Sequence, residues 1–143
     1  MDIAPGQLIG LWDANGTCLD IFPNLITSIF SKILLVNYLN QELLVIVSEK
    51  QLKIYDYVKK ELISQFLINN FFDDLLQNPE DEDQIIGINN GIVSYISLSQ
   101  QKVTKTINTP TKSRRMIVLS SGQIIIGNND GNLIHLSKFV KNA

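Results

Sequence analysis

A recurrence of about forty residues is the feature that most constrains the fold of this chain. Recurrence at this period, built from short apolar runs, is typical of proteins that repeat one small β-sheet several times. The sequence therefore predicts an all-β fold. Four passages carry the recurrence: Leu8–Asp13 (LIGLWD), Leu52–Asp56 (LKIYD), Ile92–Ser97 (IVSYIS) and Leu133–Ser137 (LIHLS). Each passage contains one ring side chain: Trp12, Tyr55, Tyr95 and His135. Successive ring residues are 43, 40 and 40 residues apart.

Each repeat unit predicts an antiparallel sheet of up to four strands, which is the construction of a β-propeller blade. The clearest unit spans residues 33–68, where four apolar runs are separated by short polar turns. Its second run, Leu43–Ser48, is almost continuously apolar, as expected of a strand that is covered on both faces. We therefore expect an incomplete blade over 7–22, a blade over 33–68, an acidic inter-blade insertion over 69–83, a blade over 84–108 and an incomplete blade over 112–137.

Turn residues separate the predicted strands. Asn15-Gly16 and Asn90-Gly91 supply the positive φ angles that two-residue turns need, and Asn40-Gln41 and Glu49-Lys50 occupy similar places. Asn15-Gly16-Thr17 also matches the N-glycosylation acceptor pattern, but its place directly after a strand favours a turn.

The recurrence also predicts which side chains form the core. If the four ring residues occupy equivalent places, the isoleucines beside them should be buried. The isoleucines expected in the core are Ile54, Ile92, Ile96 and Ile134.

A small closed β-barrel is the alternative to a propeller architecture.

The segment from Gly127 to Leu136 (GNNDGNLIHL) resembles the core of a WD repeat, in which a tight Asp-Gly turn leads into an apolar strand that closes on Trp-Asp. Leu11-Trp12-Asp13 contains that dipeptide, and Ile54-Tyr55-Asp56 contains a near version of it. The Gly-His dipeptide that typically opens a WD repeat does not occur in the sequence. The resemblance covers most of the chain apart from about residues 69–83, and it implies a degenerate WD-repeat (WD40-like) β-propeller.

The number of repeats indicates a partial propeller. Two complete units, a leading piece and a trailing piece make about three and a half blades, whereas closed propellers typically have four to eight. An open ring leaves unpaired strand edges, which invite pairing with another chain. Three interpretations follow: the chain is a segment of a longer propeller, it associates with itself, or it completes the ring of a partner by strand addition.

Charge is distributed unevenly along the chain. Residues 1–83 contain 13 acids and 5 lysines, a net charge of −8, while residues 84–143 contain one acid and 7 basic residues, a net charge of +6. Such segments attract either one another or separate partners of the opposite charge. No aromatic residue lies between Tyr95 and Phe139, so the basic segment lacks the rings on which nucleic-acid bases stack, and nucleic-acid binding is not expected. The candidate partner-binding residues are Asp73, Asp74, Asp81, Asp83, Lys112, Arg114 and Arg115.

The sequence offers few groups for catalysis. His135 is the only histidine and Cys18 the only cysteine, and we expect a packing role for the first and a buried structural role for the second. Asn128, Asp130 and Asn132 alternate as at the start of a calcium loop, but Phe139 stands where that loop requires a glutamate. We therefore expect no catalytic residue, metal or cofactor, and no enzyme activity.

Targeting signals are also absent from the sequence. No stretch approaches 18 consecutive apolar residues, and the first six residues carry no basic and apolar leader. The expectation is an intracellular chain, cytoplasmic or nuclear, with other proteins or a second copy as partners. The sequence thus predicts a non-catalytic interaction or scaffold module in a complex. The alternative is a propeller subunit of an enzyme or of a small-ligand-binding protein that another chain completes.

Overall fold

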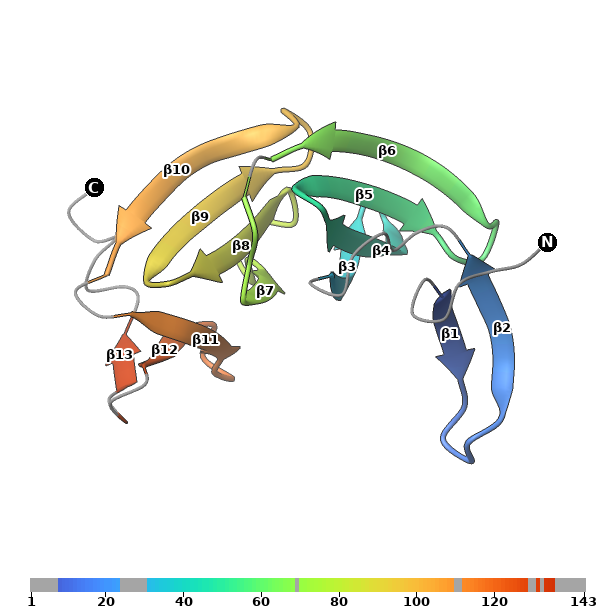
Figure 1. Cartoon of the computed structure of the whole chain (residues 1–143), viewed down its shortest axis with the longest axis horizontal. Coiled ribbons are helices and arrows are strands. Elements are labelled where there is room, and N and C mark those ends of the chain that lie inside the picture. The colour runs from blue at the N-terminus through green and yellow to red at the C-terminus, as the bar shows by residue number, and fades with distance from the viewer. Residues whose placement is uncertain are drawn as a thin grey trace.

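The regular elements of the protein are β-strands that follow one another along an open arc (Figure 1). The computed structural model describes residues 8–23, 31–68, 70–109, 112–128, 131 and 133–135. Within these residues the strands form four antiparallel sheets, and each strand pairs with its neighbour in the sequence. The sheets thus have the up-and-down topology of propeller blades.

The strands of the four sheets have the following bounds. The first sheet contains β1 (Leu8–Trp12) and β2 (Cys18–Pro23). The second contains β3 (Lys32–Tyr38), β4 (Gln41–Ser48), β5 (Gln51–Asp56) and β6 (Glu61–Leu67). The third contains β7 (Asp74–Gln77), β8 (Gln84–Asn89), β9 (Ile92–Ser97) and β10 (Lys102–Asn108). The fourth contains β11 (Ser113–Val118), β12 (Ile124–Asn128) and β13 (Leu133–His135).

The acidic segment 69–83 is not simply an insertion between blades, because β7 lies within it and pairs with β8. Leu75 and Leu76 explain this difference. Successive side chains of a strand point to opposite faces; Leu75 packs in the core against the second sheet, and Leu76 packs in the core against the fourth. Carboxylates on either side of this short apolar pair obscure the strand in the sequence. The third sheet therefore begins at residue 74 and has four strands.

The hydrophobic core consists of layers between neighbouring sheets. Between the second and third sheets, buried side chains such as Leu43 and Ile54 meet Ile85 and Ile96. A second layer lies between the third and fourth sheets, and a smaller one between the first and second. The interior sheets are thus covered on both faces, which accounts for the nearly continuous apolar runs of β4 and β8.

The predicted core isoleucines are confirmed in part. Ile54 and Ile96 are buried, with exposed fractions of 2% and 0%. Ile92 was expected in the core but is 46% exposed, because it is the first residue of β9 and follows the turn at Asn90-Gly91. The side chain of Ile134 lies outside the part of the chain that the structure describes.

Gly87 in β8 is required by close packing. A Cβ atom at this position would lie 2.4 Å from Cδ1 of Phe72, whose ring lies over the strand. Phe72 is buried in the core between the second and third sheets. The glycine therefore makes room for an aromatic ring in an otherwise isoleucine-rich strand.

The two-residue turns agree largely with the sequence. Asn90 and Gly91 have φ angles of 49° and 85°, and the expected turn at Glu49-Lys50 has φ angles of 52° and 63°. The turn expected at Asn40-Gln41 lies one residue earlier, at Leu39-Asn40, because Gln41 already pairs with Tyr38 as the first residue of β4. The connection after β1 is longer than the two-residue turn expected at Asn15-Gly16, because Trp12 pairs with Cys18, and only Gly16 of that pair has a positive φ, 85°. The Asp13 carboxylate accepts hydrogen bonds from the backbone N–H groups of Asn15 and Thr17.

Polar contacts join neighbouring sheets at their borders. The Lys60 ammonium lies 2.8 Å from a carboxylate oxygen of Asp20, which joins the second sheet to the first. The side-chain amide of Gln77 accepts a hydrogen bond from the Asn37 backbone N–H and donates one to the Asn37 carbonyl, at 3.0 Å and 2.8 Å. These contacts fix how each sheet sits against the next.

Candidate partner-binding surfaces

The acidic candidates Asp73 and Asp74 lie where the third sheet meets the fourth. The Asp74 carboxylate accepts a hydrogen bond from the backbone N–H of Met116 in β11, at 2.9 Å. The Asp73 carboxylate accepts one from the Asn90 N–H, and its carbonyl accepts one from the Arg115 guanidinium at 3.2 Å. Both residues are only half-exposed. Their polar groups are therefore engaged in holding β7, the β8–β9 turn and β11 together.

Asp83 serves as a hydrogen-bonding centre at the end of the third sheet. Its carboxylate accepts hydrogen bonds from the Ser97 hydroxyl at 2.7 Å and from the backbone N–H and hydroxyl of Ser99 at 2.8 Å and 3.0 Å. Tyr38 of the second sheet lies close enough that Asp83 affects its ionisation. Burial raises the pKa of the Tyr38 hydroxyl, and the charge and hydrogen bonding of Asp83 raise it further. Asp83 thus links two sheets.

Asp81, in the β7–β8 turn, is exposed and makes local contacts. Its carboxylate accepts a hydrogen bond from the backbone N–H of Asp83 at 3.0 Å. Its carbonyl accepts one from the Gln84 N–H, which closes the turn before β8. Of the four acidic candidates, Asp81 presents its side chain most openly to solvent.

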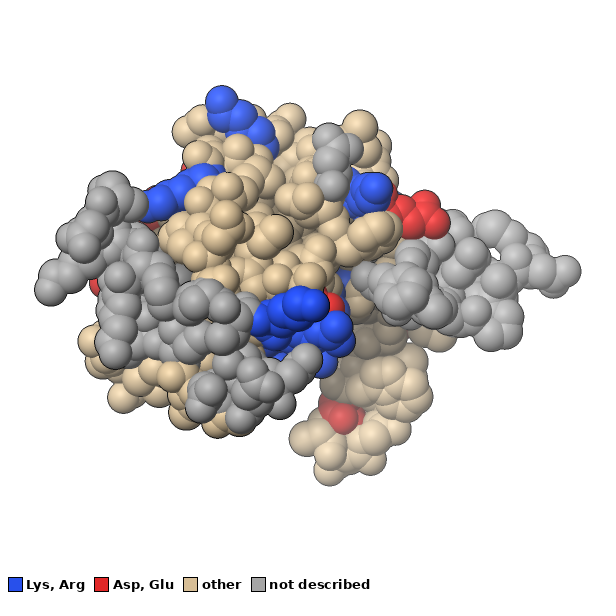
Figure 2. Space-filling model, turned by 60° about the vertical axis from the view of Figure 1, so that its left-hand side comes forward, with Lys and Arg blue, Asp and Glu red and all other residues tan. Residues whose placement is uncertain are grey.

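The basic candidates Lys112, Arg114 and Arg115 are exposed at the start of β11. Figure 2 turns the end of the arc that contains β11 toward the viewer, and the charged side chains visible on this face are mostly Lys and Arg. The structure brings Arg115 to the backbone of Asp73, whereas Asp81 and Asp83 lie at the other end of β7. The seven candidates therefore do not form one cluster, and partner binding by them remains a prediction.

The first sheet carries an exposed apolar face at one end of the arc. Ile9 and Phe22 pack toward the second sheet, so the alternate residues face away from it. Trp12, which is 61% exposed, lies on this outer face next to Ile21. A Cβ atom at Gly10 would lie 2.4 Å from the indole Nε1, so glycine lets the ring lie across the strand.

The fourth sheet has a similar face at the other end of the arc. Met116 and Ile126 pack toward the third sheet, which leaves the alternate residues on the outer face. Ile117 there is exposed, and Leu133 of β13 is 75% exposed. In the interior sheets the corresponding faces are covered by a neighbouring sheet. The sequence predicted open strand edges at both ends of the arc. The apolar faces beside those edges could be identified only from the register of the paired strands.

Of the groups considered for chemistry, Cys18 lies within the described residues. Cys18 was expected to be buried, but it is exposed, because it is the first residue of β2 in a two-stranded sheet. The side chain of His135 and most of the turn at residues 128–132 lie outside the described residues. Among the described residues, no three His, Cys, Asp or Glu side chains are placed to hold a metal ion. The described residues contain no helix that is long and apolar enough to cross a membrane.

Solved structures place this arrangement among known folds. No family profile matches the sequence, and no curated protein matches it either. The crystal structure of the WD40 β-propeller domain of Doa1 is similar to this chain, with a TM-score of 0.66 and 18% sequence identity. The similarity covers 90% of this chain and 43% of that one, so the chain spans less than half of the propeller it matches. The chain therefore has the fold of a partial, WD40-like β-propeller.

Proposed function

We propose that the chain is a non-catalytic protein–protein interaction or scaffold module of an intracellular assembly. It binds other proteins, or a second copy of itself, through the outer faces of its terminal sheets and through its inter-blade loops. The observation that carries the proposal is the exposure of large apolar side chains at both ends of the arc, above all Trp12 and Leu133. Contiguous exposed apolar surface of this kind marks interaction sites in soluble proteins.

The charged loops add specificity to this proposal. Lys112, Arg114 and Arg115 lie on the same sheet as the apolar face at the β11–β13 end, where they would attract an acidic partner surface. Asp81 offers an acidic counterpart on the β7–β8 turn. Complementary charge of this kind mainly sets encounter rate and partner choice, while apolar burial contributes most of the affinity.

Serine substitutions at two equally exposed apolar residues test the proposal. Leu133 lies on the terminal sheet and Val58 on the β5–β6 turn, and both are 75% exposed. Leu133→Ser should reduce the mass of the assembly isolated with the chain, because it removes apolar surface from the binding face. Val58→Ser should leave that mass unchanged. Equal effects of the two substitutions would show that the terminal face has no special role.

A further inference from the structure

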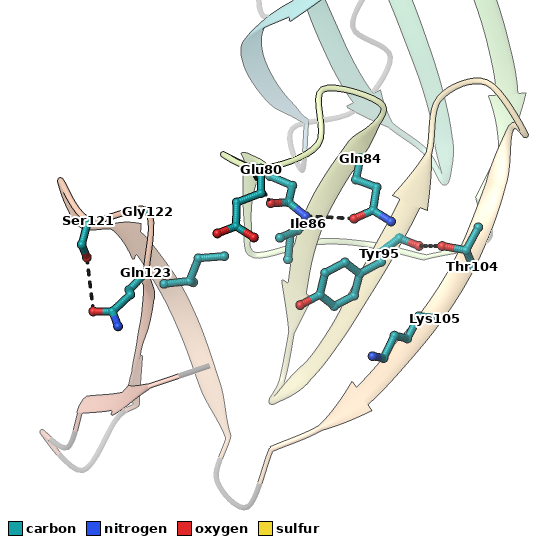
Figure 3. Close-up of a pocket in the computed structure, with 11 residues that line it drawn as sticks. Glu80, Gln84, Ile86, Tyr95, Thr104, Lys105, Ser121, Gly122 and Gln123 are labelled. Carbon is teal, nitrogen blue, oxygen red and sulfur yellow. Dashed lines mark hydrogen bonds between the residues drawn. The ribbon is translucent and has the colours of Figure 1, made fainter. Parts of the chain in front are cut away.

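A cleft of about 560 Å³ lies between the third and fourth sheets (Figure 3). One wall comes from the β7–β8 turn and strands β8, β9 and β10, and the other from the β11–β12 turn and the start of β12. The wall residues are mostly polar, with two isoleucines at the base. Six of them carry the argument below: Glu80, Ile86, Tyr95, Lys105, Gln123 and Ile124.

Three of these residues form one row across the third sheet. Ile86 of β8 pairs with Tyr95 of β9, and Tyr95 pairs with Lys105 of β10. Directly paired residues project on the same face of a sheet. The Lys105 ammonium lies 5.9 Å from the centre of the Tyr95 ring, and Figure 3 shows the ammonium and the Tyr95 hydroxyl both directed toward the fourth sheet.

Tyr95 is a buried residue that lines the cleft, and its hydroxyl has no hydrogen-bond partner among the described residues. Tyr95 is only 8% exposed, and its ring packs in the core between the third and fourth sheets with the Lys105 ammonium over it. Burial raises the pKa of this hydroxyl, which therefore remains a neutral donor at physiological pH. A buried tyrosine hydroxyl normally finds a partner, so a group that enters the cleft would satisfy it.

The remaining polar groups define what the cleft can accept. Lys105 of β10 supplies a positive charge and Glu80 of the β7–β8 turn a negative charge, both on the wall from the third sheet. The side-chain carbonyl of Gln123 accepts a hydrogen bond from the Ser121 hydroxyl, which turns its NH₂ group into the available donor. Ile86 and Ile124 provide an apolar base. The wall from the third sheet thus offers a cation, a neutral donor and an anionic acceptor, and the wall from the fourth sheet offers a second neutral donor.

We propose that this cleft binds a peptide segment of a partner protein through a carboxylate, which accepts hydrogen bonds from the Lys105 ammonium and the Tyr95 hydroxyl. The Gln123 amide and the Glu80 carboxylate pair with the C=O and N–H groups of the peptide. The carboxylate comes either from an aspartate or glutamate side chain or from a peptide C-terminus. This site rests on the proposed interaction function and names the partner chemistry for one surface.

Nuclear magnetic resonance titration of the isotope-labelled full chain tests the site. The probes are three acetylated tripeptides: Ala-Glu-Ala amide, Ala-Ala-Ala with a free C-terminal carboxylate, and Ala-Gln-Ala amide as the neutral control. The backbone amides of Gly122 and Gln123, which line the cleft, report binding. At least one of the two acidic peptides should shift these signals saturably and bind more tightly than the neutral peptide. The acidic peptide that binds better identifies the source of the carboxylate.

Three variants assign the contacts. Tyr95→Phe removes only the hydroxyl and Lys105→Gln only the charge, and each should weaken acidic-peptide binding by about tenfold, as expected for a charge-assisted hydrogen bond. Lys102→Gln, on the same strand but outside the cleft, should have no effect. The urea midpoint of Tyr95→Phe should match that of the parent chain, because no hydrogen bond within the described residues is lost.

Several results would overturn the site. They are equal binding of the neutral peptide, no saturable shift at Gly122 and Gln123, or unchanged acidic-peptide affinity in both Tyr95→Phe and Lys105→Gln. Failure of this site is distinguishable from failure of the proposed function. A chain whose assembly depends on Leu133 but which ignores all three peptides would retain the function and lose only this cleft.

Discussion

At the scale of single residues, the fold depends on a small number of buried side chains that fill the layers between sheets. Ile54 projects from β5 into the layer against the third sheet and is 2% exposed. Removing its side chain beyond Cβ would leave a cavity, since neighbouring sheets hold the layer open. Ile92 lies at the start of β9 and provides a matched comparison, because the same substitution there removes far less buried surface.

Ile54→Ala should therefore lower the free energy of unfolding by roughly 2–4 kcal/mol. Ile92→Ala should lower it by less than about 1 kcal/mol, because a partly exposed side chain leaves no closed cavity. Urea denaturation of both variants measures the difference. Similar costs for the two substitutions would contradict the assignment of Ile54 to the core.

Gly87→Ala tests a contact that depends on the absence of a side chain. The added methyl would overlap the Phe72 ring and should cost roughly 1–3 kcal/mol of stability, which is typical of overpacking. Combining it with Phe72→Leu should reduce the extra cost of the alanine, because the overlapping ring is gone. Strictly additive effects in thermal or urea unfolding would show that Phe72 does not lie over Gly87.

At the scale of elements, the sequence predicts the strands well and their faces less well. Strand β5 ends at Asp56, so Tyr55 lies one residue before its end. Strand β9 ends at Ser97, so Tyr95 lies two residues before its end. A shift of one residue turns a side chain to the opposite face. Tyr55 accordingly packs toward the first sheet and Tyr95 toward the fourth. The forty-residue spacing places Tyr55 and Tyr95 at equivalent positions of the repeat. Strand pairing shows that they lie on opposite faces of their sheets.

The candidate sites were also only partly predictable from the sequence, because their positions depend on which face of a sheet each residue occupies. Clusters of charge in the sequence identified Asp73 and Arg115, which the fold does bring together. The cleft beside Tyr95 could not be predicted from the sequence, because its walls come from turns and strands far apart in the chain and its position depends on which face Tyr95 occupies. Strand β7 was missed for a local reason, since only two apolar residues mark it among carboxylates.

The turn between β3 and β4 provides an element-scale prediction. Leu39 and Asn40 adopt φ angles of 54° and 60°, a conformation that costs a residue such as leucine roughly 1 kcal/mol. The double substitution Leu39→Asn and Asn40→Gly installs the residues that such turns prefer. It should raise the urea midpoint, with a gain of about 1 kcal/mol in stability. An unchanged or lowered midpoint would contradict the assigned turn geometry.

At the scale of the whole molecule, the arc joins two halves of opposite charge, and each end presents an apolar face. The net charges of −8 and +6 fall on residues 1–83 and 84–143. Trp12 therefore lies at the acidic end and Leu133 at the basic end (Figure 1). Opposite charge beside apolar surface suits association with partners through both ends.

Charge reversal at the basic end separates the electrostatic contribution from the apolar one. Replacing Lys112, Arg114 and Arg115 by Glu should weaken a complex strongly at low salt and less at high salt, since exposed charges are screened by ions. The fold should persist, because these side chains are exposed and, within the described residues, their replacement removes only one hydrogen bond between sheets, from the Arg115 guanidinium to the Asp73 carbonyl. Binding isotherms at two salt concentrations measure this effect. Unchanged affinity at low salt would remove the basic residues from the interface and leave the apolar faces as the remaining candidate.

If the ends of the arc are binding surfaces, as we propose, the chain isolated from its cells should have a larger mass in solution than one copy of the chain. The mass of one chain is 16.1 kDa. Light scattering after gentle isolation should give a larger mass, either a multiple of this value for self-association or its sum with the mass of another protein. A stable particle of 16.1 kDa at all concentrations, with Trp12 open to a fluorescence quencher, would contradict the account.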